Sequence, residues 1–190
     1  QQAEADLTAK TLADQIGAFA AQYPMEVDYS AILLGIPGTA DMDLSARDLL
    51  YPDIAHERFP VAPLYFQQDY PNTMYGNFSL VTYGCGITTM SMLATYMTDT
   101  ELSPPTMCKR YGRYCSLHGS DPTLFIYPPA EMDFYLKEQV FNSAPALKAL
   151  QEGYIVVCLQ KKGMWTNGGH FLLLEKLNEN GTVQVRDSNL

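Results

Sequence analysis

Three residues of this chain could together form an activated thiol. Cys85 lies between two glycines at the start of a helix-like run, His170 begins an apolar run much further along, and Asp187 ends the run after that. Nucleophilic catalysis by a thiol needs these three groups: the thiolate, a proton acceptor, and a carboxylate that orients the acceptor. The sequence therefore predicts a cysteine hydrolase with Cys85, His170 and Asp187 as its catalytic residues.

Two features are expected to activate Cys85. The first turn of a helix presents unpaired N–H groups and partial positive charge, which favour a thiolate. A histidine beside the sulfur can accept its proton. Gly84 and Gly86 are expected to leave room for a substrate backbone next to the sulfur. The triplet alone is a weak signal, because most cysteines in such a place are small core residues.

The end of the chain is expected to bring His170 and Asp187 together. Apolar and β-branched runs predict strands over 154–160, 170–177 and 182–186, with a turn at 178–181 between the last two. An antiparallel hairpin places the first residue of one strand near the last residue of its neighbour. The alternatives are a histidine that is simply a satisfied polar residue, and an Asx-type strand end at 187–189.

A thiol hydrolase also needs hydrogen-bond donors for the oxyanion of the tetrahedral intermediate. The backbone N–H of Cys85 can supply one. A side-chain amide ahead of the nucleophile usually supplies another, and the segment 65–70 offers Gln67 and Gln68.

The remaining elements suggest an α+β fold. Helical periodicity predicts helices over 4–23, 86–97 and 106–114, with one or two short helices within 130–152, and the loop-rich stretch 35–64 could hold another around 44–50. Helices followed by strands are typical of the α+β class. We expect an N-terminal extension over 1–62 and the main domain over 63–190. The helix over 4–23 could be an inhibitory pro-segment, although packing on the domain surface is the simpler interpretation.

Composition limits the partners. The 190 residues include 21 acidic and 12 basic ones, giving a formal net charge of −9. This balance argues against nucleic acid or an anionic membrane as the main partner, because both need clustered Lys and Arg. No apolar run approaches the roughly 18 residues of a membrane span. The chain begins at Gln1 without a recognisable signal peptide, which is typical of a trimmed or mature form.

The other three cysteines do not form a clear disulfide pattern. Cys158 lies in an apolar strand-like run and is expected to be a buried, inert thiol. Cys108 and Cys115 would be too far apart for a disulfide on one unbroken helix, but a bend near Gly112 could join them. With His118 nearby a zinc site is possible, although three ligands are weak evidence. We expect no metal and no cofactor.

These motifs resemble a known family in their order and spacing. From about 63 to 189, roughly two thirds of the chain, the sequence resembles the stand-alone branch of papain-like cysteine peptidases related to the bacteriocin-processing (double-glycine leader) peptidases. The segments that carry the resemblance are Phe66-Gln67-Gln68-Asp69, Tyr75-Gly76, Gly84-Cys85-Gly86-Ile87-Thr88-Thr89-Met90, Gly168-Gly169-His170-Phe171 and Asp187-Ser188-Asn189.

The resemblance implies a papain-like fold, in which a helical part with the nucleophile at a helix N-terminus packs on an antiparallel sheet. It makes Cys85 the nucleophile, His170 the general base, Asp187 the orienting carboxylate and Gln67 the oxyanion donor, with Gln68 as the rival. Two features depart from the family: the glutamine precedes the cysteine by more residues than in the transporter-linked members, and Ser188 stands where proline is common. Together with the missing membrane domains, the longer gap argues against a leader peptidase coupled to a transporter.

The implied substrate is a peptide or protein, with Trp165 and Gly169 expected to contact it. A packing role for Trp165 is an equal alternative. The expected location is extracellular or in the envelope of a bacterial cell, and the oligomeric state stays open. Two other functions are compatible with the same residues: a papain-fold acyltransferase, which passes the acyl group to an amine or thiol, and a catalytically inactive cell-surface binding module.

Overall fold

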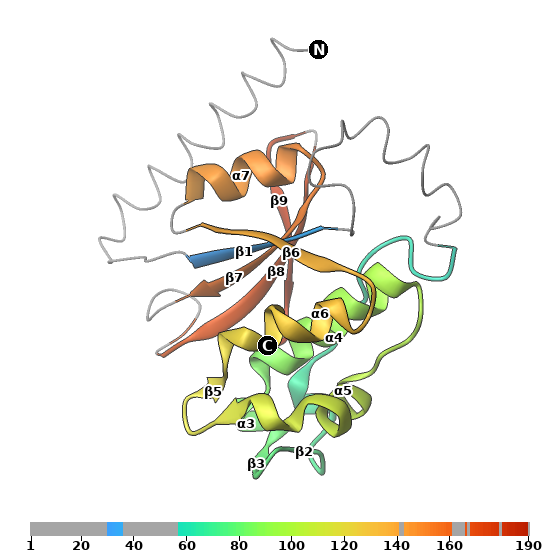
Figure 1. Ribbon diagram of the computed structural model, residues 1–190, viewed down its shortest axis with the longest axis vertical. Coiled ribbons are helices and arrows are strands. Elements are labelled where there is room, and N and C mark those ends of the chain that lie inside the picture. Colours follow the sequence, from blue (N-terminus) through green and yellow to red (C-terminus); the bar gives the residue numbers. More distant parts are fainter. Residues whose placement is uncertain are drawn as a thin grey trace.

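The computed structural model describes residues 30–35, 57–140, 143–160, 166, 168–178 and 180–189 (Figure 1). The predicted helices over 4–23 and 44–50 and the predicted substrate contact Trp165 lie outside the described residues.

A five-stranded antiparallel sheet forms the centre of the molecule, with the strand order β6-β1-β7-β8-β9. Its strands are β1 (Ser30–Gly35), β6 (Tyr135–Val140), β7 (Ile155–Gln160), β8 (His170–Leu177) and β9 (Val183–Asp187). The three C-terminal strands confirm the prediction from the sequence, including the antiparallel hairpin of β8 and β9. The turn between them is closed by a hydrogen bond from the Asn178 N–H to the Thr182 carbonyl at 2.8 Å.

Two strands of this sheet were not expected. β1 lies within the segment 1–62 that was separated as an extension, yet it pairs with both β6 and β7. Residues 30–35 are therefore part of the central sheet. β6 falls where short helices were predicted over 130–152, and only the helix α7 (Ser143–Gln151) matches that prediction.

Helices surround the sheet, together with two small hairpins that pair β2 with β3 and β4 with β5. α4 (Cys85–Thr98) and α5 (Pro104–Tyr111) confirm the helices predicted over 86–97 and 106–114. The shorter elements are η2 (Gln67–Asp69), β2 (Met74–Tyr75), β3 (Phe78–Ser79), α3 (Leu80–Tyr83), η3 (Gly112–Tyr114), β4 (Cys115–Ser116), β5 (Gly119–Ser120), η4 (Pro122–Phe125) and α6 (Tyr127–Ala130).

Helices cover both faces of the sheet. Figure 1 shows α7 on one side and α4, α5 and α6 on the other. Two hydrophobic cores flank the sheet, and alternate residues of its strands pack in one or the other. Val157 and Phe171 pack in the core that contains α4, whereas Val156 and Leu172 pack in the core that contains α7. This explains why β7 and the first half of β8 are continuous apolar runs, as expected for strands covered on both faces.

α4 is the central helix of the larger core. Its residues from Gly86 to Thr95 are all buried, and the Thr89 hydroxyl donates a hydrogen bond to the Phe171 carbonyl of β8 at 3.2 Å. The helix ends at Thr98, and the next residue, Asp99, has a left-handed backbone conformation. α4 is therefore fixed against β8, and its N-terminus is held beside the sheet. Among the described residues, no helix combines the length and the apolar character that crossing a membrane requires.

Candidate active site

Cys85 is the first residue of α4, at the end of the helix where backbone N–H groups lack helical partners. Gly84 precedes it without a side-chain cap, and its carbonyl accepts the Thr88 N–H at 2.9 Å. Cys85 is partly exposed, whereas the glycines on both sides are buried. The partial positive charge of the helix end favours an anion at this position.

The two glycines beside Cys85 are needed for packing. A Cβ atom on Gly84 would collide with the carbonyl and side chain of Leu80. A Cβ atom on Gly86 would collide with Ser120 and stand 3.0 Å from the Phe171 ring. The interpretation that these glycines leave room for a substrate is therefore corrected: they allow α3 and β5 to approach the nucleophile's helix.

This packing predicts that Gly86→Ala lowers the free energy of unfolding by about 1–3 kcal/mol, the usual cost of overpacking a core. The backbone of β5 must shift to accept the methyl group. Urea unfolding of the two proteins measures the loss. Gly168→Ala is the matched control, because no atom lies within 4 Å of its added Cβ, and its stability should stay close to that of the unmodified chain.

His170 and Asp187 form the closest charged contact of the site. The imidazole Nε2 lies 2.7 Å from Asp187 Oδ1, and His170 is only 4% exposed. The register explains the contact: Asp187 is opposite Leu172, so His170, two residues before Leu172 in β8, is its diagonal neighbour on the same face. Asp187 Oδ1 also accepts the Asn189 N–H at 2.8 Å, which fixes the carboxylate.

The side chains around His170 stabilise its protonated form. Burial alone would lower the pKa of His170, but hydrogen bonds and charge interactions with Asp187 and the Cys85 side chain outweigh it and raise the pKa from 6.5 to about 9. Because Nε2 is held by Asp187, Nδ1 is the ring nitrogen left for the thiol. The imidazole thus interacts with both the Asp187 carboxylate and the Cys85 thiol.

Gln67 is buried and is the first residue of η2. Its backbone N–H donates to the Ser188 carbonyl at 2.9 Å, and its side-chain Nε2 donates to the Val81 carbonyl at 2.5 Å. The amide carries two N–H groups, so one remains for another acceptor. Gln68, the rival of Gln67, is exposed and donates to the Asn189 side chain instead.

Ser188 is a site residue that sequence reasoning treated only as a departure from a motif. It is fully buried, and its hydroxyl lies 3.5 Å from both Gln67 Oε1 and the Cys85 carbonyl oxygen. Ser188 thereby links the C-terminal end of β9 to the glutamine and to the peptide of the nucleophile. The only signal in the sequence was its place between Asp187 and Asn189.

Gly169, the other predicted substrate contact, is exposed beside His170, and a Cβ placed on it would meet only Leu159 and Gln160 at ordinary contact distances. Its surface is therefore open next to the imidazole.

The other cysteines are free thiols outside this arrangement. Cys158 is buried, as predicted, and burial raises its pKa to about 12. Burial also raises the pKa of Cys108 to about 12, and that of the partly exposed Cys115. In the described part of the chain, no cluster of three or more His, Cys, Asp or Glu side chains could hold a metal ion.

Comparison of the chain with protein-family models, curated proteins and solved structures found no match.

Proposed function

We propose that this protein is a cysteine peptidase or amidase of the papain-like type, a stand-alone relative of the bacteriocin-processing peptidases. One observation carries the proposal: a buried imidazole has its Nε2 on Asp187 at 2.7 Å and also interacts with the side chain of Cys85, the first residue of a 14-residue helix. A helix carrying the thiol packed on an antiparallel sheet carrying the imidazole and carboxylate also fits this fold.

The proposed reaction proceeds through a thioester. The Cys85 thiolate attacks the carbonyl carbon of a peptide or amide, and the oxyanion accepts hydrogen bonds from the Cys85 N–H and the remaining N–H of Gln67. The His170 imidazolium gives its proton to the departing amine, and the neutral imidazole then removes a proton from the water that hydrolyses the thioester. Asp187 keeps the ring oriented and stabilises its charged form.

Alkylation of the thiols across pH tests the proposal. Iodoacetamide reacts with thiolates, so Cys85 is expected to be labelled rapidly at pH 6, where an ordinary thiol with a pKa of about 8.5 is almost fully protonated. Peptide mapping by mass spectrometry follows each cysteine separately in one sample.

Cys115 provides the internal control. It is partly exposed like Cys85, and burial raises its pKa, so its labelling should begin only at alkaline pH. If Cys85 and Cys115 were labelled at similar rates at pH 6, the thiol would not be activated and the proposed function would be rejected.

A further inference from the structure

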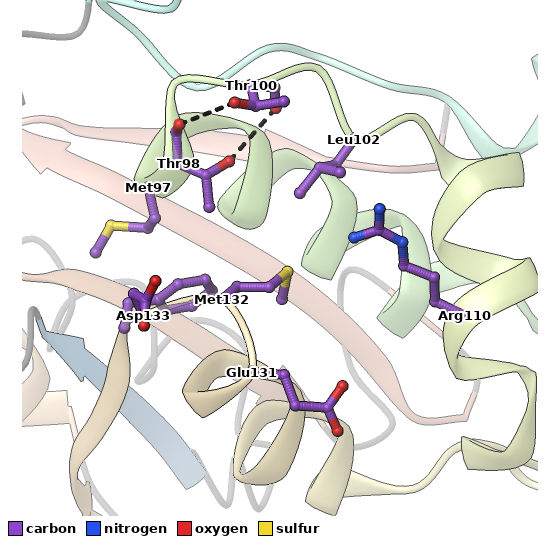
Figure 2. Close-up of a pocket in the computed structure, with 9 residues that line it drawn as sticks. Met97, Thr98, Thr100, Leu102, Arg110, Glu131, Met132 and Asp133 are labelled. Carbon is purple, nitrogen blue, oxygen red and sulfur yellow. Dashed lines mark hydrogen bonds between the residues drawn. The ribbon is translucent and has the colours of Figure 1, made fainter.

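A second candidate site lies at the other end of α4. A pocket of about 470 Å³ opens between the end of α4, α5 and the turn that joins α6 to β6 (Figure 2). Because α4 has 14 residues, it spans about 21 Å, and the pocket is separated from Cys85 by most of that length. The residues that line it are Met97, Thr98, Thr100, Leu102, Arg110, Glu131, Met132, Asp133 and Phe134.

The floor of the pocket is apolar and well supported. Leu102 and Phe134 are 6% and 1% exposed, and both belong to the larger core. Met97 and Met132 are partly buried against the same core. Methionine side chains are flexible and adapt to ligands of different shape. Such a floor suits an aliphatic or aromatic side chain.

Opposite charges stand at the two ends of this floor. Figure 2 shows Arg110 and Asp133 at opposite ends, with Met132 between them. Within the part of the chain that the structure describes, neither the Arg110 side chain nor the Asp133 side chain makes a hydrogen bond or an ion pair. Glu131, by contrast, is paired with Arg113 at 3.4 Å. The described residues therefore leave one cation and one anion of the pocket uncompensated.

Asp133 is held in a defined position. Its backbone has a φ of 61°, a left-handed conformation that aspartate tolerates better than most residues. The neighbours on both sides donate their N–H groups to the Pro129 carbonyl, Met132 at 2.9 Å and Phe134 at 3.1 Å. The turn thus presents the carboxylate from a hydrogen-bonded backbone.

We propose that this pocket binds a short apolar peptide with free termini. Its carboxylate would pair with the Arg110 guanidinium, whose planar shape matches carboxylates, and its ammonium would pair with Asp133. Its side chains would cover the methionine floor. The volume lies within the range of small-molecule sites, and a zwitterion is the ligand that satisfies both charges at once. The inference is independent of the chemistry at Cys85.

Calorimetric titration with the dipeptide Leu-Phe tests the proposal. The protein is the full chain carrying Cys85→Ala, which prevents turnover of the dipeptide. N-acetyl-Leu-Phe lacks the ammonium and Leu-Phe amide lacks the carboxylate. Each is expected to bind about tenfold more weakly than Leu-Phe, the loss of one charge-assisted hydrogen bond. Arg110→Gln should bind Leu-Phe and its amide equally, and Asp133→Asn should bind Leu-Phe and its N-acetyl form equally.

Lys109→Gln is the matched control, because Lys109 is an exposed cation on α5 that does not line the pocket. It should leave the affinity and the discrimination unchanged. The proposal is overturned if Leu-Phe does not bind, if the blocked dipeptides bind as well as the free one, or if alkylation of Cys85 in the unmodified chain abolishes binding, which would assign the ligand to the other site.

Discussion

Replacing His170 by alanine is expected to slow the alkylation of Cys85 at pH 6 by about a hundredfold. Without the imidazole no neighbouring group accepts the thiol proton, and an ordinary thiol with a pKa of about 8.5 is only roughly 0.3% thiolate at pH 6. The paired thiolate is intrinsically less nucleophilic, which reduces the difference somewhat. Hydrolysis of a peptide should fall further, because the leaving amine also loses its proton donor.

The same pair predicts a pH dependence. Hydrolysis needs the His170 imidazolium as the acid, so its rate should fall as pH rises through about 9, the pKa to which Asp187 and Cys85 raise this group against the effect of burial. Asp187→Ala removes one cause of the increase in the pKa and should move this alkaline fall in rate to lower pH.

Stability should depend on pH through the same group. Because the pKa of His170 in the folded protein is above the ordinary value of 6.5, the contribution of His170 to stability is complete below pH 6.5 and is lost as pH rises through about 9. His170→Ala should lack this component.

His118→Ala is the control for both measurements, because His118 is an exposed histidine whose side chain makes no hydrogen bond or ion pair with the described residues. It should leave the alkylation rate and the alkaline fall in hydrolysis rate unchanged. Equal alkylation of Cys85 in the unmodified chain and in His170→Ala would contradict the proposed pairing. An alkaline fall in rate that does not move in Asp187→Ala would show that the carboxylate has no influence on the imidazole.

The sequence was sufficient to predict elements whose pattern is local. α4, β8 and β9 have clear helical or strand patterns, and a short turn determines the pairing of the last two strands. That pairing predicted that His170 and Asp187 share a face of the sheet and lie close together. A register shift of one residue would instead move one of them to the other face. In the structure, His170 Nε2 lies 2.7 Å from Asp187 Oδ1.

Non-local packing could not be predicted in the same way. β1 pairs with β6 and β7, whose residues lie more than a hundred positions later, and no turn signal connects them. The collision of a Gly86 side chain with Ser120 also depends on β5, which is separated from α4 along the chain by other elements. Likewise, Arg110 and Asp133 give no pattern that would place them at one pocket. These features follow from the assembled fold.

Replacing Glu175 by alanine is expected to lower the free energy of unfolding by about 3–5 kcal/mol, the usual cost of breaking a buried ion pair on one side. The Glu175 carboxylate accepts the Arg186 Nε–H at 2.8 Å and the Ala62 N–H at 2.9 Å. The side chains of Glu175 and Arg186 are 5% and 15% exposed, so water cannot readily replace the lost partner. Ala62 is also buried, and its N–H would lose its acceptor.

Urea unfolding distinguishes the buried charge from simple loss of packing. Lys148→Ala breaks the exposed pair of Lys148 with Glu152, where the lysine side chain is 75% exposed, and should cost less than about 0.5 kcal/mol. The double variant Glu175→Leu with Arg186→Leu removes both charges and should recover most of the stability that Glu175→Ala loses, because no unpaired guanidinium remains. If the double variant were no more stable than Glu175→Ala, the cost would come from the lost Ala62 contact and from packing, and the unpaired charge of Arg186 would not be its cause.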